Sequence, residues 1–489
     1  QRLYYVFCDW IINMRLIGGN ISDTPVKEIG DGSAFNVGGG TGAPDLVVVG
    51  TVPATGTAQS NFDESVEQLR EDGNPGCGKY TAKWSDNSYG CFWLSNTAPY
   101  KLYYSHITTN SDGSFAAIAT KVDLSGDLTV ASNGTHTSQA AAIAGVKLSA
   151  SRVVLHLSFP GADGALGQED LVYDKDGDTV AEHGTVFDHG TPTRSDYTAT
   201  SNLVAAVNAD QGIVFHMDPS GAYTKISATP VHFTGTKTAG TMRDVTDRST
   251  NDQGGVAFSD NSSPAKVFTT RQGSSDGTSA LKEWSFTPGT TPELAGSYAA
   301  DYSGWTYPSG AKFGSVETQS DGSFDCGGGM GVSLINRNDI ERGRFISTLY
   351  GVSGAPEIGF FGGVSTNKSI VYNVAYMSVA GTHLGTDSNI NSKILEIDYN
   401  DETYWGRYLH VGVLSGGAIF ITPFNYNWNT FQMIRSAVGD LPNKAASATL
   451  ANGAHLYDVL LGSSSADNIC IIYAEATDDI RYLDVPITK

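Results

Sequence analysis

The chain has 489 residues, so its length does not limit the core that it can bury, and it forms either several domains or one large repetitive domain. Charged residues make up only 17% of the chain and glycine occurs 57 times, a composition typical of short strands joined by tight turns. The 51 acidic and 30 basic side chains give a formal net charge of −21, which repels phosphate backbones and excludes nucleic acid as an expected partner.

The N-terminal segment, residues 1–32, opens with the apolar run LYYVFCDWIINMRLIG. Asp9, Asn13 and Arg15 interrupt this run, which is too short and too polar to cross a bilayer. We expect a strand here rather than a membrane span. The only stretch with helical spacing follows at residues 60–72, SNFDESVEQLRED, where one or two helical turns are expected in an insertion loop.

From residue 33 onward the chain repeats a hairpin pattern of an apolar strand, a turn with Asp and usually Gly, and a second strand. Gly reaches positive φ and Asp bonds its own backbone, so such turns predict tight hairpins. In chain order the copies are KVDLSGDLTV (121–130), VYDKDGDTV (172–180), VFHMDPSGAYTKI (214–226), WSFTPGTTPEL (284–294), LYGVSGAPEIGFF (349–361), ILEIDYNDETYW (394–405) and IYAEATDDIRYLDV (472–485).

A second pair of strands, joined by a short polar loop, precedes several of these turns. The examples are VKLSASRVVLHLSF (146–159), LVAAVNADQGIVFHM (203–217), VSLINRNDIERGRFISTLY (332–350) and YDVLLGSSSADNICIIY (457–473). Two strands plus two strands make a four-stranded unit, and the units recur every 45 to 70 residues or so, within the range of propeller blades.

The predicted fold is therefore an all-β propeller of about seven or eight four-stranded blades, formed by residues 33–489. Residues 1–32 are expected to close the ring by pairing with the C-terminal IRYLDVPIT. Tandem β-sandwich domains are the alternative, because they also alternate strands with Gly-rich turns.

The five cysteines are too few for a disulfide scaffold and too scattered for a zinc knuckle. Cys77 and Cys91 flank one loop-like segment, where a disulfide and two thiols are both consistent with the sequence. Asn-x-Ser/Thr sequons at Asn20, Asn133, Asn261 and Asn367 occur at about the frequency expected by chance.

Histidines recur at comparable places in different repeats, at His106, His156, His216 and His410. Imidazoles that converge on a propeller axis would suit iron, zinc or copper, the site of a metal-dependent oxygenase. The alternative is that each histidine bonds polar groups between blades, which we favour because the spacings are uneven. No metal and no other cofactor is therefore assigned from the sequence.

Three further patterns resemble sites but fail in detail. The run EHGTVFDH holds Glu182, His183, Asp188 and His189 without the spacing or helix of a zinc protease. Asp174, Asp176 and Asp178 alternate like calcium ligands, yet the distal Glu is missing, so a plain hairpin turn is expected. A G-x-S-x-G pattern at Gly273, Ser275 and Gly277 precedes a strand instead of a helix, so we assign no catalytic residue.

Two aromatic clusters allow either sugar stacking or core packing, and core or interface packing is the expectation. The clusters are Trp84, Tyr89, Phe92 and Trp93, then Phe424, Tyr426 and Trp428. Paired carboxylates at the mouth of a propeller leave no linear signature, so a secreted carbohydrate-active enzyme or a lectin with an axial site stays an alternative function.

Lines such as RVVLHLSF (152–159) and NICIIYAEATDDIRYLDV (468–485) lead from a polar loop through a strand and an Asp-rich turn to a return strand. In this pattern the chain from about Ser33 onward resembles the repeat-built β-propeller proteins of tailed phages and other viruses of aquatic microbes. The resemblance implies a virion surface or tail component that binds hosts or other virion proteins.

The function expected from the sequence is a non-enzymatic structural or adhesive propeller, located outside a cell or on a virion surface. Its expected partners are other structural proteins or surface glycans, with a possible homo-oligomer and no membrane insertion.

Overall fold

The computed structural model describes the chain in segments that contain almost only strands. These segments are residues 43–59, 79–94, 101–124, 142–160, 166–183, 187–188, 203–217, 226–234, 238–244, 253–259, 265–272, 279–302, 312–313, 317–318, 324–325, 332–334, 345–350, 356–361, 376–378, 391–400, 402–403, 405–413, 418–427, 432–435, 444–449, 455–463, 465–476 and 479–489. Within them the regular elements are all β-strands, as the sequence predicts. None of these segments holds a helix that could span a membrane.

The first two sheets in chain order are antiparallel. One contains Lys79–Ser85 (β3), Ser88–Leu94 (β4), Leu102–Thr109 (β5), Phe115–Ile118 (β6) and Val122–Asp123 (β7), of which β6 and β7 both pair with β5. The other contains Ala142–Lys147 (β8), Arg152–Pro160 (β9), Leu166–Asp174 (β10), Thr179–His183 (β11) and Phe187–Asp188 (β12).

Three more sheets and one small hairpin follow. The β13–β16 sheet contains Leu203–Ala206 (β13), Gln211–Met217 (β14), Ile226–His232 (β15) and Arg243–Asp244 (β16). The β17–β20 sheet contains Gln253–Ser259 (β17), Ala265–Gln272 (β18), Ser279–Thr287 (β19) and Glu293–Tyr302 (β20). The next sheet contains Lys312–Phe313 (β21), Val332–Leu334 (β24), Phe345–Tyr350 (β25), Pro356–Phe361 (β26) and Tyr376–Ser378 (β27), and Glu317–Thr318 (β22) pairs with Phe324–Asp325 (β23).

The last two sheets complete the set. The β28–β32 sheet contains Asn391–Asn400 (β28), Trp405–Val413 (β29), Ala418–Asn427 (β30), Gln432–Arg435 (β31) and Lys444–Thr449 (β32). The final sheet contains His455–Leu461 (β33), Asn468–Ala476 (β34) and Asp479–Thr488 (β35), joined by Val48–Val49 (β1) and Thr57–Ala58 (β2) from the other end of the chain.

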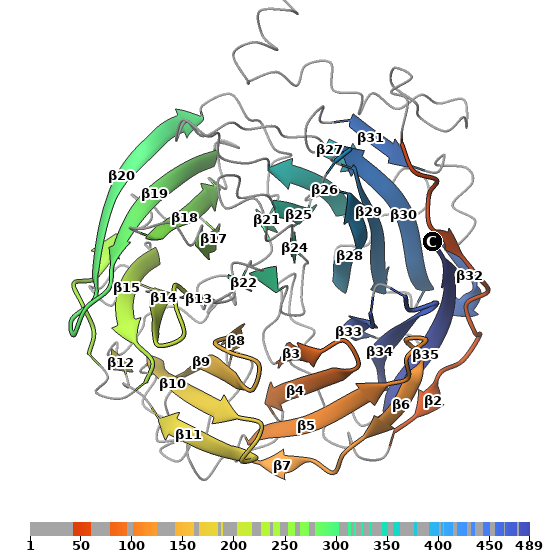
Figure 1. Ribbon diagram of the computed structural model, residues 1–489, viewed down its shortest axis with the longest axis horizontal. Helices are drawn as coiled ribbons and strands as arrows, with labels where there is room; N and C mark the ends of the chain where they lie inside the picture. The colour runs from red at the N-terminus through yellow and green to blue at the C-terminus, as the bar shows by residue number, and fades with distance from the viewer. Residues whose placement is uncertain are drawn as a thin grey trace, which may run out of the picture.

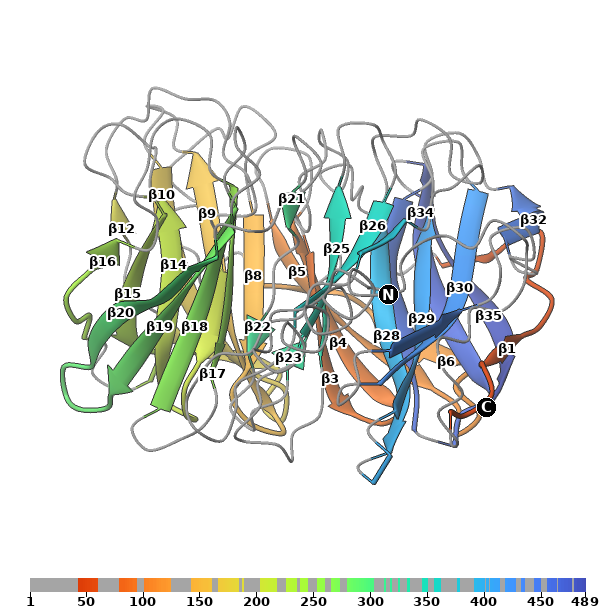
Figure 2. The ribbon, with the colours of Figure 1, turned by 90° about the horizontal axis from the view of Figure 1, so that it is seen from above.

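These sheets stand around a common axis as the blades of a β-propeller (Figure 1), with their strands running along the axis (Figure 2). The described residues form seven sheets of four or five strands, apart from the two-stranded β22–β23 sheet. In the β8–β12, β13–β16, β17–β20 and β28–β32 sheets the first strand lies nearest the axis, and in the final sheet β33 does, with β1 and β2 on the outer side of β35 (Figure 1).

Burial on both faces of each sheet distinguishes this ring from tandem sandwiches. On β9, Leu155 belongs to a core cluster shared with the β3–β7 sheet, while the adjacent Val154 belongs to a cluster shared with the β13–β16 sheet. On β34, Ile471 faces the β28–β32 sheet and Ile472 faces the β3–β7 sheet. A sandwich buries only one face of each sheet, so the sandwich alternative is wrong.

The predicted hairpins are present wherever the structure describes both strands. Thus β8 pairs with β9, β19 with β20, β28 with β29 and β34 with β35, all antiparallel. In the turn of residues 174–179, positive φ falls on Asp178, at 50°, and not on Gly177 as the sequence pattern suggests. The residues 125–130 of the first copy and the expected helical turns at 60–72 lie outside the described part.

The ring is closed by pairing between the two ends of the chain. Strand β35 pairs on one side with β34 and on the other with β1 and β2, so the final sheet contains both early and late residues. The strand predicted to close the ring, residues 1–32, lies outside the described part, and the closing strands that the structure shows lie at 48–49 and 57–58.

Gly56 fixes the closing segment against the final sheet. Its amide donates a hydrogen bond to the Tyr473 hydroxyl (2.9 Å). A Cβ atom at this position would lie 2.5 Å from that hydroxyl oxygen and 2.7 Å from the backbone oxygen of Tyr482. Only glycine therefore allows the closing segment to approach β34 and β35 this closely.

We expect Gly56→Ala to lower the free energy of unfolding by about 1–3 kcal/mol, because the added methyl group overlaps the backbone of β35. The matched control is Gly289→Ala, whose Cβ would meet only ordinary contacts of 3.6 Å or more. Urea unfolding followed by tryptophan fluorescence measures both variants. Equal stabilities for the two variants would show that the closing segment does not stabilise the ring.

Candidate functional site

Short turns join the first and second strands of several sheets, among them the β13–β16 and β28–β32 sheets. Polar side chains near these turns cap backbone amides, as Asx turns do. Asn208 Oδ1 accepts hydrogen bonds from the amides of Asp210 and Gln211, and Asn400 Oδ1 accepts from the amides of Glu402 and Thr403, all at 2.9 Å. These caps position the ends of the inner strands, and a polar network of the described residues lies at the ends of β3, β8 and β33.

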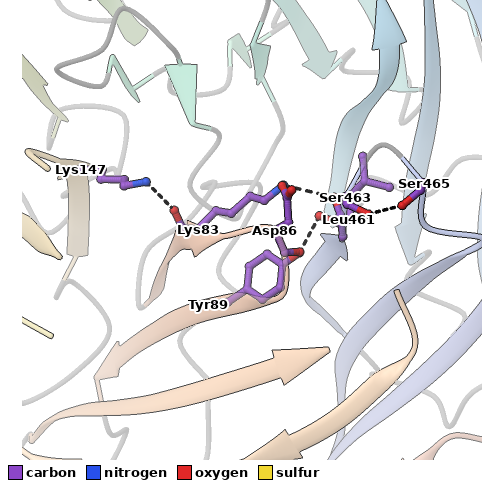
Figure 3. A network of polar contacts seen from close by, with 8 residues as sticks. Lys83, Asp86, Tyr89, Lys147, Leu461, Ser463 and Ser465 are labelled. Carbon is purple, nitrogen blue, oxygen red and sulfur yellow. Dashed lines mark hydrogen bonds and ion pairs between the residues drawn. The ribbon is translucent and has the colours of Figure 1, made fainter. Parts of the chain in front are cut away.

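The candidate site is this network, which links the inner strands of three consecutive sheets (Figure 3). Lys147, the last residue of β8, donates through Nζ to the backbone oxygen of Lys83 on β3 (2.9 Å). Lys83 Nζ in turn donates to the backbone oxygen of Gly462, just after β33 (3.2 Å), and lies 3.2 Å from Asp86 Oδ1. Each lysine thus reaches a carbonyl of the neighbouring sheet, so the two side chains join three blades.

Tyr89 strengthens the same junction from β4. Its hydroxyl lies 2.5 Å from the backbone oxygen of Leu461 and 3.1 Å from that of Asp86 (Figure 3). Burial raises the pKa of Tyr89 far above its ordinary value, so the hydroxyl stays protonated and acts as a donor at physiological pH.

A second contact joins the β3–β7 sheet to the final sheet, at the turn after β5. The backbone oxygen of Asp112, in the turn after β5, accepts from the amides of Asp467 (2.9 Å) and Asn468 (2.8 Å). The Asp112 carboxylate accepts from the amide (3.0 Å) and hydroxyl (2.6 Å) of Ser114, and these bonds lower its pKa. Gly113 completes this turn with a φ of 87°.

A half-buried carboxylate, Asp484 on β35, also takes part in the contact between the β3–β7 sheet and the final sheet. It accepts a hydrogen bond from the amide of Phe115 (2.9 Å), and the Phe115 ring stacks on Tyr482 with centroids 4.0 Å apart. Burial is the main cause of the raised pKa of Asp484, and the hydrogen bond from Phe115 offsets it only in part. The carboxylate therefore supports the junction by accepting a bond while its charge is partly desolvated.

The described donors and acceptors of this region bond groups of the same or neighbouring sheets and so hold the sheets together. Among the described residues no group of three His, Cys, Asp or Glu side chains is arranged to hold a metal ion. Cys91 is a buried thiol and not half of a disulfide, so the Cys77–Cys91 bond is not formed. Cys77 itself lies outside the described part.

Of the four histidines that the sequence singles out, the two with described side chains, His106 and His156, lie apart. His106 on β5 contacts Ser88 Oγ through Nε2 (2.7 Å), and burial is the main cause of its lowered pKa. His156 on β9 is fully buried and bonds Asp170 on β10 through Nδ1. Because His156 shares the face of Val154, it points toward the β13–β16 sheet, away from the β3–β7 sheet that carries His106.

A shared metal site for these two histidines is therefore wrong, and a structural role between blades is the better account of them. His216 lies on β14 and His410 on β29, and their side chains are outside the described part. Sequence reasoning missed the carboxylate partner of His156, since Asp170 lies 14 residues away and faces it only across the β9–β10 pairing.

The structure places the three remaining sequence patterns only in part. Asp174, Asp176 and Asp178 form the predicted hairpin turn, where Asp174 Oδ1 accepts from the amide of Asp176 (3.0 Å) and Asp178 accepts from the Tyr173 hydroxyl. Glu182, His183 and Asp188 lie on the outer strands β11 and β12, with side chains outside the described part, as are His189 and the Gly273, Ser275 and Gly277 pattern.

The first aromatic cluster is core, as expected. Trp84, Tyr89, Phe92 and Trp93 are at most 5% exposed, so none of them offers a face to a sugar ring. Phe424 is also fully buried and stacks on Tyr408 with centroids 5.2 Å apart. Tyr426 and Trp428 lack described side chains.

The lysines that carry the network were not predicted. Lys83 and Lys147 both come at or near the end of an inner strand, just before a turn rich in Ser, in AKWSDNS and VKLSAS. The repeated lysine at the end of an inner strand could have predicted these contacts. In so acidic a chain, most basic residues are expected at scattered surface positions, and a repeated position is therefore informative.

No family model and no curated protein matches the sequence. Solved structures with a similar arrangement include the BP39L lectin from Burkholderia pseudomallei, at 11% identity and a TM-score of 0.44, with 84% of this chain and 95% of that chain covered. Drosophila Semaphorin 2a matches at 9% identity and a TM-score of 0.41, covering 86% of this chain and 76% of that one. A mutant of the NanB sialidase from Streptococcus pneumoniae matches at 8% identity and a TM-score of 0.38, covering 88% and 70%.

We expect Lys83→Met to lower the free energy of unfolding by about 1 kcal/mol, since the Gly462 carbonyl of the next sheet loses its donor. Lys101→Met is the matched control, because both lysine side chains are 41% exposed and both pair with an aspartate. The ion pair between Lys101 and Asp123 lies within one sheet. Urea unfolding should therefore show a smaller loss for Lys101→Met, and equal losses would contradict a junction between sheets.

The raised pKa of Asp484 predicts a specific pH dependence. The folded state holds the proton of Asp484 more tightly than the unfolded chain, so its contribution to stability falls as pH rises from the unfolded value of about 3.9 through the raised folded value. Asp484→Asn keeps an oxygen for the Phe115 amide but does not titrate. Its free energy of unfolding relative to the natural chain should therefore increase between about pH 3 and pH 7.

Asp484→Ala is the control, because it removes the acceptor and should be less stable than Asp484→Asn at every pH. A natural chain that gains stability over Asp484→Asn as pH rises would show that the folded carboxylate prefers its charged form.

Proposed function

We propose that this chain is a non-enzymatic structural or adhesive β-propeller, displayed outside a cell, in an extracellular assembly or on a virion. It acts through contacts with proteins or surface glycans. The observation that carries the proposal is the network of Lys147, Lys83 and Tyr89, whose donors bond carbonyl groups of their own or neighbouring sheets.

This use of polar groups suits a rigid platform. Bonds between the inner strands fix one blade relative to the next, and the pairing of β35 with β1 and β2 fixes the ring as a whole. A rigid scaffold presents binding loops in a constant geometry, which lowers the entropy lost when a partner binds.

The net charge of the chain favours some classes of partner over others. A formal net charge of −21 repels nucleic acids and anionic lipid surfaces, and it favours neutral glycans and proteins with a neutral or basic surface. This agrees with an exterior location, where the protein meets other structural proteins or surface glycans.

The proposal is tested by following the native protein with an antibody through velocity sedimentation. Co-sedimentation of the chain with a large particle, filament or envelope fraction is the expected result, and it should survive washing at moderate salt. Recombinant protein added to the same fraction after depletion of the native protein is the control for specific attachment. A native chain that stays free in solution and neither rebinds the depleted fraction nor binds arrayed glycans would contradict the proposal.

A further inference from the structure

A serine hydroxyl and a histidine imidazole meet on the face that the β3–β7 sheet turns toward the β8–β12 sheet. Ser88 Oγ, at the start of β4, lies 2.7 Å from Nε2 of His106 on β5. The register of the two strands explains this contact, because Gly90 lies opposite His106 and has no side chain, and Ser88 is the next residue along the same face of β4. The strand pairing therefore builds the pair.

The pair lies at the rim of a buried interface. Phe92 and Tyr104, on the same face of β4 and β5, are buried in a core cluster shared with the β8–β12 sheet. Ser88 and His106 are only partly buried. The hydroxyl is therefore within reach of a small molecule in solution, while the aromatic core beside it holds the two strands in place.

The turn after β10, in the neighbouring sheet, brings two charges close to the pair. Burial is the main cause of the lowered pKa of His106, the charge of Lys175 lowers this pKa further, and the charge of Asp178 opposes the shift. The imidazole is therefore neutral above its ordinary pKa of 6.5, and a neutral imidazole has one ring nitrogen that accepts a proton. Asp178 stabilises the imidazolium that such a transfer creates.

We propose that Ser88 is a site of acylation, at which His106 acts as the general base and a neutral ester supplies the acyl group. The Ser88 Oγ–H bond breaks and its proton passes to His106 Nε2, while Oγ forms a bond to the carbonyl carbon of the ester. The C–O bond of the ester then breaks, and the departing alkoxide takes the proton from His106 and leaves as an alcohol. The chain keeps the acyl group, so the step is a modification without turnover, and it goes beyond the proposed binding function.

The net charge of the chain selects the class of group donor. A formal charge of −21 repels anionic phosphoryl donors, whereas a neutral ester approaches without this electrostatic cost. Acylation at Ser88 is therefore favoured over phosphorylation at the same hydroxyl.

The test treats the full folded chain with p-nitrophenyl acetate, a neutral ester with a coloured leaving group, and maps the acetyl groups by mass spectrometry of peptides. We expect the natural chain to carry an acetyl group on Ser88, and the corresponding peptide of Ser88→Ala to carry none. His106→Gln should lower the rate of acetylation at Ser88 at least about 100-fold, which is within the usual contribution of a general base.

Ser151→Ala is the matched control. Ser151 is also a partly exposed serine, and its backbone oxygen, which the substitution keeps, accepts from the amide of Lys175 (2.8 Å). This variant should acetylate Ser88 at the natural rate. Circular dichroism of each variant checks that the fold is retained.

The pH dependence of the natural chain gives a second measurement that needs no variant. The rate of acetylation should rise below pH 6.5, as His106 loses its proton, and should stay constant above about pH 7. An unassisted hydroxyl reacts through its alkoxide and continues to accelerate as the pH rises. No acetyl group on Ser88, an unchanged rate in His106→Gln, or a rate that keeps rising above about pH 7 would each overturn the proposal.

Discussion

The structure depends on one constraint, which is that sheets such as the β8–β12 sheet and the final sheet have two apolar faces. Val154 and Leu155 on β9 show this directly, since adjacent residues of one strand belong to two different core clusters. A sheet that is apolar on both faces needs a neighbour on each side, and a row of such sheets ends only by closing into a ring. The propeller therefore results from the burial of both sheet faces, and no single sequence motif is required for it.

Closing the ring brings residues from opposite ends of the chain into one sheet. The partners of β35 include Val48 and Thr57, and the turn after β5 rests against the loop before β34. The same interface buries Trp93, Tyr457 and Cys470. Early and late residues must therefore be present together before the first and last sheets can bury their facing surfaces.

Polar groups also join neighbouring sheets, both at the closure and next to it. Lys83 and Lys147 are cations in a strongly acidic chain, yet they reach backbone carbonyls of neighbouring sheets. Tyr89, kept protonated by burial, adds a neutral donor at the same place. Contacts of this kind fix each blade relative to its neighbours.

The sequence by itself determined the class of the fold and most of the hairpins. Strand alternation and turn chemistry act between residues near in sequence, so WSFTPGTTPEL and IYAEATDDIRYLDV predict their pairings without knowledge of the rest of the chain. The burial of Trp84, Phe92 and Trp93 was also predicted, because large aromatic residues in a strand-rich segment usually lie in the core.

Only the tertiary structure decided which distant residues meet. The partner of His156, the carbonyls reached by Lys83 and Lys147, and the closing role of Val48–Val49 all depend on strand pairing or on contacts between blades. Many such arrangements are compatible with one local pattern of hydrophobicity. The choice among them is made by packing and by hydrogen bonds over hundreds of residues, which local spacing does not encode.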